Sequence, residues 1–150
     1  MLPPTLVTWI LIIFGYITCG PLLYIQFLVM RDPGDKKVKD LVIGKDQDWH
    51  DETHFRSAKA GARADLFIFG PLLILGTVGV LLGTVWGYVV YAAAGAIMLY
   101  INVTLWFQEK ENIYPLVGPF AYYTYYWGNF VYWGLASITY AVLRLNGIWV

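Results

Sequence analysis

Long uninterrupted apolar stretches alternate with short polar ones along this chain of 150 residues. Four stretches are long enough to cross a bilayer as helices, because a hydrocarbon core of about 30 Å needs roughly 20 helical residues. They run from about residue 6 to 30, 65 to 82, 85 to 107 and 120 to 145. No sustained alternation predicts strands, and four strands cannot close a barrel in lipid. The pattern therefore predicts an all-α integral membrane protein, a four-helix transmembrane bundle in a single domain.

The charged residues gather in the one long polar segment, residues 31–64. Charged residues make up 13% of the chain, against roughly 25% in soluble domains. With four crossings, this loop and residues 108–119 share one side, which holds nine of the ten Lys and Arg. Basic loops stay in the cytoplasm, so we expect loop 31–64 to be cytoplasmic and both termini to lie on the opposite side. Acids match the bases in number, which gives no reason to expect nucleic-acid binding.

The charged loop has helical character in its second half. Residues 32–37 contain the turn sequence Asp-Pro-Gly-Asp, and the segment from Asp48 to Asp65 has the pattern of a helix. Asp48 is a suitable N-cap, and Lys59 and Arg63 come late in the segment, where the helix dipole favours cations. We expect an interfacial helix that leads straight into the second span.

Glycine and proline shape the second and third spans. Gly79, Gly83 and Gly87 are spaced by four residues, a pattern that lets helices approach closely in lipid. The alternative is that Gly83 and Gly87 serve only the turn between the helices. Pro71 cannot donate a hydrogen bond to the carbonyl of Phe67, so a kink is expected there.

Two histidines in the loop are candidates for a metal site. His50 and His54 are four residues apart and share a helix face, and an acid such as Asp46 or Glu109 would complete the ligand set. The segment is similar to the zinc motif H-E-x-x-H, although Asp51 replaces the glutamate and no third ligand is evident. The alternative is a polar, solvated start of a helix.

Three acids at the mouths of the second and third spans are candidates for proton transfer. Asp65, Glu109 and Glu111 lie where the apolar stretches meet the polar loops. A carboxyl group among aromatic residues at this depth can act as a proton donor or acceptor. The alternative is that these acids end the helices in the headgroup layer.

Polar and aromatic residues follow helical spacing on the third and fourth predicted spans. An asparagine in lipid is costly unless it is hydrogen-bonded, so Asn102 and Asn129 must face the bundle or each other. An interfacial aromatic belt does not explain Asn129, Tyr132 and Trp133, which lie deeper and are expected in the bundle interior. That interior is either simply packed or surrounds a ligand. The candidate ligand-binding residues are Asn102, Trp106, Tyr122, Tyr126, Asn129 and Trp133.

Several short motifs in the second half resemble a known family. They are Gly70-Pro71-Leu72, Leu105-Trp106-Phe107 followed by Glu109, then Pro119, and an aromatic run ending in Gly128-Asn129 with Trp133 beyond. Over residues 66–140 the chain resembles the EXPERA, or emopamil-binding, group of membrane proteins, which includes sterol isomerases and ligand-binding relatives. The resemblance implies a four-helix bundle that holds a flat apolar molecule, with Asn129 and Trp133 in the pocket and Glu109 as an acid. The chain departs from the group in having neither histidine nor acid in the first span.

Two functions follow from these observations. The first is an intramembrane pocket for a flat apolar molecule of the sterol, terpenoid or quinone type, in a binding protein or a proton-shuttling isomerase. The alternative is a non-catalytic membrane subunit or assembly protein, whose aromatic and glycine faces dock a partner protein or a second copy. Membrane lipids are expected partners in both cases, and no cofactor is predicted.

Overall fold

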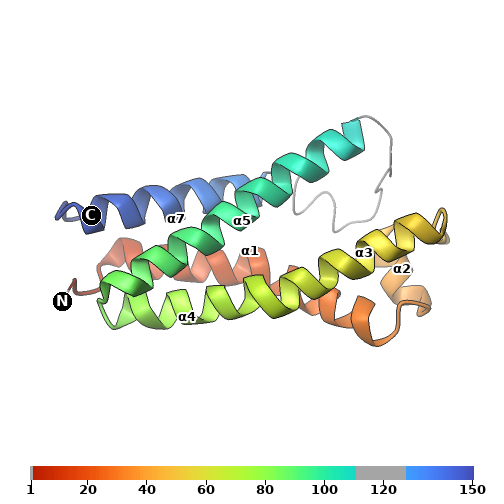
Figure 1. Cartoon of the computed structure of the whole chain (residues 1–150), viewed down its shortest axis with the longest axis horizontal. Helices are drawn as coiled ribbons and strands as arrows, with labels where there is room; N and C mark the ends of the chain where they lie inside the picture. The colour runs from red at the N-terminus through yellow and green to blue at the C-terminus, as the bar shows by residue number, and fades with distance from the viewer. Residues whose placement is uncertain (1, 111–127) are drawn as a thin grey trace.

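The computed structural model describes residues 2–110 and 128–150, with side chains for residues 2–107 and 128–150. This part of the chain is helical and contains no strand (Figure 1). The helices are α1 (Leu6–Arg31), α2 (Lys36–Val42), α3 (Glu52–Ala64), the π-helix η1 (Asp65–Phe69), α4 (Gly70–Leu81), α5 (Val85–Lys110) and α7 (Asn129–Leu145). The prediction of an all-helical fold is confirmed for these residues.

Among the described residues, three helices are long and apolar enough to cross a membrane. They are α1, the continuous helix Glu52–Leu81 made of α3, η1 and α4, and the segment Val85–Phe107 of α5. They correspond to the first three predicted spans, which fits a membrane protein. The predicted fourth span, 120–145, begins outside the described residues, and its described part is α7, which has 17 residues.

The first helix has clear start and stop signals. The Thr5 side chain accepts from the backbone of Thr8, and the Thr8 hydroxyl accepts from the backbone N–H of Thr5 at 2.8 Å. This reciprocal capping box satisfies N–H groups that the first turn leaves without helical partners. α1 ends at Arg31 because Pro33 disfavours helical backbone at the residue before it.

The hairpin between α4 and α5 depends on close backbone contact. A Cβ at Gly87 would come within 2.1 Å of the Gly79 backbone, so the two helices touch where neither has a side chain. Gly83 has a φ of +65° and forms the turn. The three glycines predicted as one series therefore have two roles. Gly79 and Gly87 allow α4 and α5 to pack closely, and Gly83 forms the turn between them.

The third span also packs closely against α7 through small residues. A Cβ at Gly134 would lie 2.6 Å from the carbonyl oxygen of Gly95, and one at Gly95 would lie 3.0 Å from the Cβ of Ser137. α5 therefore lies between α4 and α7, and α1 contacts α4 and α7 as well. The buried core of the molecule is formed where these four helices meet.

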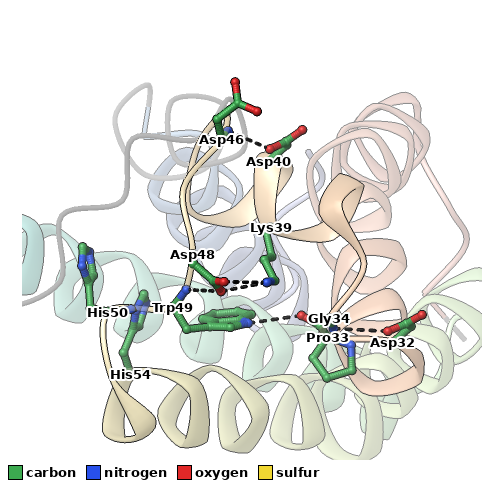
Figure 2. A network of polar contacts seen from close by, with 10 residues as sticks. All are labelled: Asp32, Pro33, Gly34, Lys39, Asp40, Asp46, Asp48, Trp49, His50 and His54. Atoms are coloured by element: carbon green, nitrogen blue, oxygen red, sulfur yellow. Dashed lines mark hydrogen bonds and ion pairs between the residues drawn. The ribbon is translucent and has the colours of Figure 1, made fainter.

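The charged loop is folded, and its helix begins later than predicted. Asp48 does not cap α3, because its carboxylate pairs with Lys39 at 2.8 Å (Figure 2). Asp51 is the cap instead, and its carboxylate accepts from the backbone N–H of His54 at 2.7 Å. The expectation that this helix leads straight into the second span is confirmed. The short helix α2, capped by Asp35, was not predicted.

The two termini lie at one end of the molecule, and the charged loop lies at the other (Figure 1). At the terminal end Arg144 is buried, and its guanidinium donates to the carbonyl of Pro3 at 2.6 Å. The ring of Trp149 stacks on this guanidinium at 4.6 Å. The N-terminal segment is also held by a hydrogen bond of 2.9 Å from Leu2 to the carbonyl of Gly83. Arg144 thus holds the start of the chain against the end of α7.

Candidate functional site

A buried carboxylate lies inside the helical bundle. Asp65 is the first residue of η1 and is only 4% exposed. The side-chain amide of Gln26, on α1, donates to its Oδ2 atom at 2.8 Å. The ion pairs among the described residues all lie in the charged loop, and none includes Asp65. Its hydrogen-bond partner is therefore a neutral amide from a neighbouring helix.

The wide helical turn at Asp65 has a clear cause in the sequence. Pro71 has no N–H and its ring would collide with the carbonyl four residues earlier in a regular α-helix. The helix widens just before it, and Gly70 N–H donates to the carbonyl of Asp65, five residues back. The kink expected near Phe67 thus takes the form of a π-helix. Single π-turns inside longer helices are frequent at functional sites.

Asn102 lies at about the same level of the bundle as Asp65. α4 and α5 are held in register where a Cβ at Gly76 would come within 2.8 Å of the Tyr91 backbone. Asn102 is eleven residues beyond Tyr91, and Asp65 is eleven residues before Gly76. Because helices rise about 1.5 Å per residue, both positions lie at a similar distance from this contact. Figure 1 shows that α5 diverges from α3 toward this end of the molecule.

Asn102 is buried, as predicted for an asparagine in an apolar span. It is 4% exposed, and its Oδ1 atom accepts no hydrogen bond among the described residues. A buried amide oxygen without a donor costs about 1–3 kcal/mol. Asn102, Asp65 and the partly buried Gln26 are therefore polar groups on three different helices.

Trp133 occupies the centre of the molecule. It is fully buried, and its indole N–H donates to the carbonyl of Leu11 at 3.1 Å. Its ring meets those of Tyr91 and Phe69 edge-on, with centroids 5.5 and 6.4 Å apart. A Cβ at Gly15 would lie 2.5 Å from the indole nitrogen, so only glycine fits beneath the ring. Trp133 thus joins α1, η1, α5 and α7, and its contact with a ligand stays a prediction.

The other predicted site residues are distributed as follows. Asn129 begins α7 and is partly buried, whereas Trp106 is 43% exposed. Tyr132 is 62% exposed, so the expectation that it faces the interior is wrong. Consecutive helical residues point about 100° apart, and the neighbouring Trp133 takes the inward position. The side chains of Glu109, Glu111, Tyr122 and Tyr126 lie outside those that the structure describes.

The two histidines stack on each other. The ring centroids of His50 and His54 are 5.2 Å apart and nearly parallel, and Nδ1 of His54 accepts from the backbone N–H of His50 at 3.3 Å (Figure 2). Trp49 meets His54 edge-on. Within residues 2–107 and 128–150, no three potential metal ligands of the His, Cys, Asp or Glu type come together. The metal site stays a prediction.

Gln26 is a residue of this site that was not predicted from the sequence. It is the only side-chain amide in the apolar run from residue 6 to 30, which contains no charge. A lone strongly polar residue in a membrane helix is expected to face a partner within the bundle. That signal was present in the sequence, but its partner is set by the register between two helices.

The fold and this site define a helical protein whose described residues include three helices able to cross a membrane, one of which carries a buried carboxylate bonded to a neighbouring helix. No family model, no curated protein and no solved structure matches the chain.

Proposed function

We propose that the chain is an integral membrane protein in which α1, the helix Glu52–Leu81, α5 and α7 form a four-helix transmembrane bundle. α7 alone has 17 residues, or about 26 Å at 1.5 Å per residue, close to the thickness of a hydrocarbon core. Large apolar side chains cover the outside of the helices, such as Ile13 on α1 and Ile74 on α4, both more than half exposed. Such a surface is disfavoured in water and suits contact with lipid.

We further propose that Asp65 is the centre of an intramembrane site for a small apolar molecule with one polar group. The burial of this carboxylate in a helix able to cross a membrane is the observation that carries the proposal. Ionisable groups in such helices are rare and mark substrate or proton pathways. Gln26 donates to one oxygen of Asp65, and in this proposal the amide of Asn102, at a similar level on α5, would offer the ligand a second polar contact.

The ligand class follows from this mixture of groups. The surroundings are apolar, and only a few polar side chains are available to orient a ligand, as is usual for sites of small apolar molecules. A flat molecule of the sterol, terpenoid or quinone type would place its single polar end at Asp65. Asp65 would then bind the polar group or exchange a proton with it. Transfer of that proton within the ligand would make the protein an isomerase, with Glu109 and Glu111 as further candidate acids.

Gentle extraction followed by mass spectrometry tests the site. The full chain is purified in mild detergent, and small molecules that remain bound are identified in the wild type, Asp65→Asn and Glu52→Gln. Glu52 is an exposed acid on the same continuous helix and serves as the matched control. Loss of a hydrogen bond to a charged group weakens binding by roughly tenfold or more. We therefore expect the molecule to be depleted by that factor in Asp65→Asn and retained in Glu52→Gln.

The contrary results are equally defined. Equal retention by Asp65→Asn, when its unfolding temperature matches that of the wild type, would exclude Asp65 from the site. A wild type that carries a partner protein and no small molecule would replace this proposal with the role of a non-catalytic subunit. Asn102→Leu and Asn129→Leu then map the site, since a pocket residue affects retention without lowering the unfolding temperature.

A further inference from the structure

The acids of the charged loop are all engaged by groups of the loop itself. Four of them accept hydrogen bonds from backbone N–H groups: Asp32, Asp35, Asp40 and Asp51. Three others form ion pairs with basic side chains: Asp46, Asp48 and Glu52. Figure 2 shows several of these contacts around α2 and the turn that precedes α3. The loop therefore uses its negative charges to hold its own fold.

The eight basic residues of the loop divide into three that form ion pairs and five that form none of the ion pairs of the described residues, namely Arg31, Lys37, Lys45, Lys59 and Arg63. Lys36, Lys39 and Arg56 are the partners of the three paired acids. Arg31 and Arg63 are exposed and take part in none of the ion pairs of the described residues. Both lie next to the apolar part of helices that can cross the membrane. Of the paired residues, Lys36 and Lys39 belong to α2, and Arg56 lies seven residues before Arg63, farther from the apolar part.

The hydrogen bond between Gln26 and Asp65 fixes the height of these two arginines. Arg31 is five residues beyond Gln26 on α1, and Arg63 is two residues before Asp65 on the neighbouring helix. At about 1.5 Å per residue, both lie within roughly 8 Å of the pair along the helix axes. The apolar part of each span begins at this level, so the arginines lie at the depth of the headgroup layer.

We propose that Arg31 and Arg63 form a binding surface for the phosphate groups of anionic phospholipids. Lys59, one helical turn from Arg63, adds a third positive charge beside Phe55, whose ring centroid is 5.8 Å from its ammonium. A guanidinium binds phosphate through two parallel hydrogen bonds. Because the acids of residues 31–64 are engaged elsewhere, these guanidinium groups can take their anion from the phosphates of the membrane. The inference rests on the membrane placement proposed above and is independent of the Asp65 site.

Native mass spectrometry of the full chain in detergent, titrated with phosphatidylglycerol or phosphatidylcholine, tests the proposal. The variant R31Q/R63Q removes two exposed charges next to the spans. The control K37Q/K45Q removes two exposed lysines of α2 and the turn after it, which are also outside the ion pairs of the described residues. Each basic residue near a membrane surface strengthens binding of anionic lipid roughly fivefold. We expect R31Q/R63Q to bind phosphatidylglycerol about 25-fold more weakly, and K37Q/K45Q to bind it as the wild type does.

The conservative variant R31K/R63K keeps both charges and should recover most of the affinity. The proposal is overturned if R31Q/R63Q binds phosphatidylglycerol like the wild type, if both double variants lose the same affinity, or if phosphatidylcholine binds equally well. Displacement of the lipid by millimolar inorganic phosphate would also overturn it, since it would identify a site for free phosphate. Asp65→Asn should bind phosphatidylglycerol normally, which separates this surface from the proposed ligand site.

Discussion

The pair formed by Gln26 and Asp65 is the feature at residue scale that most distinguishes this molecule from a simply packed bundle. Each of the two side chains lies in an otherwise apolar stretch, and each satisfies the other at 2.8 Å. Removing one partner leaves the other polar group buried without a hydrogen bond, and this costs more free energy than replacing both partners by apolar side chains. Each side chain is therefore tolerated only while the other is present. Two apolar residues would serve stability at least as well, so we infer that the pair has a functional purpose.

A double-mutant cycle checks this argument. Gln26→Leu leaves the buried carboxylate without its donor and should lower the free energy of unfolding by roughly 1–3 kcal/mol. The double variant Gln26→Leu/Asp65→Leu removes both polar groups and should be more stable than Gln26→Leu alone. Chemical unfolding in detergent micelles measures both. A loss in the double variant equal to the sum of the losses in Gln26→Leu and Asp65→Leu would show that the two side chains do not interact.

The exposed ion pair between Lys39 and Asp48 gives a prediction about pH. The hydrogen bond from Lys39 is the largest cause that lowers the pKa of Asp48, and one from the backbone of Trp49 adds to it. Because the folded-state pKa lies below the unfolded value, the pair contributes to stability above about pH 3.8 and loses this contribution as the pH falls through the folded-state pKa. In Lys39→Gln, an NMR titration of the Asp48 carboxyl should report a higher pKa than in the wild type. An unchanged value would mean that the pair is absent in solution.

The sequence allowed part of the site to be predicted, and physical cost explains which part. Asn102 had to be buried because an amide facing lipid is disfavoured, and the structure confirms this. The pairing of Gln26 with Asp65 could not be predicted, because it depends on the register of α1 against the neighbouring helix. Trp133 and Tyr132 show the same limit, since neighbouring helical residues point about 100° apart and only the packing of α7 against the other helices decides which of the two is buried.

At the scale of elements, small residues decide how closely the helices pack. Gly79 and Gly87 bring α4 and α5 together, and Gly95 and Gly134 do the same for α5 and α7. Without a hydrophobic driving force between helices in lipid, such close contacts are a main source of association. The register that they set also brings Asn102 level with Asp65.

Two glycine-to-alanine substitutions separate packing from helix propensity. Gly20→Ala lies on α1 where nothing is within 4 Å of the added methyl group, so it should be neutral or should stabilise by up to about 1 kcal/mol. Gly87→Ala would place a Cβ 2.1 Å from the Gly79 backbone and should destabilise by roughly 1–3 kcal/mol. Unfolding temperatures in the same detergent compare the two. Similar effects of both substitutions would contradict the close packing of α4 against α5.

The elements were predictable to different degrees. The first three spans follow directly from the length of the apolar runs, and the first two end within about a residue of the expected positions, whereas α5 continues to Lys110, three residues beyond the expected end of the third. The predicted start of α3 was wrong. Asp48 and Asp51 are equally good N-caps in isolation, and the ion pair between Asp48 and Lys39 leaves Asp51 as the cap. α2 has seven residues and depends on burying Val38 against α1 and α3 residues, which a local pattern does not reveal.

At the scale of the whole molecule, the two ends differ in character. The loop end carries the ion pairs, the capping acids and the exposed arginines Arg31 and Arg63, whereas the terminal end is closed by the N-terminal segment and the buried Arg144. The Asp65 site lies near the loop end, about five residues inside the end of α1. A ligand would therefore reach Asp65 from the loop side of the proposed bundle.

Labelling of single cysteines in sealed vesicles of known orientation tests the central claim, that the helices cross a bilayer with loop 31–64 on one side and both termini on the other. The native Cys19 is buried and is replaced by alanine, after which Lys45→Cys and Ile148→Cys place an exposed thiol at each end of the molecule. We predict that a membrane-impermeant maleimide labels Lys45→Cys from the cytoplasmic side only and Ile148→Cys from the opposite side only. Labelling of both positions from the same side would contradict the four-crossing arrangement.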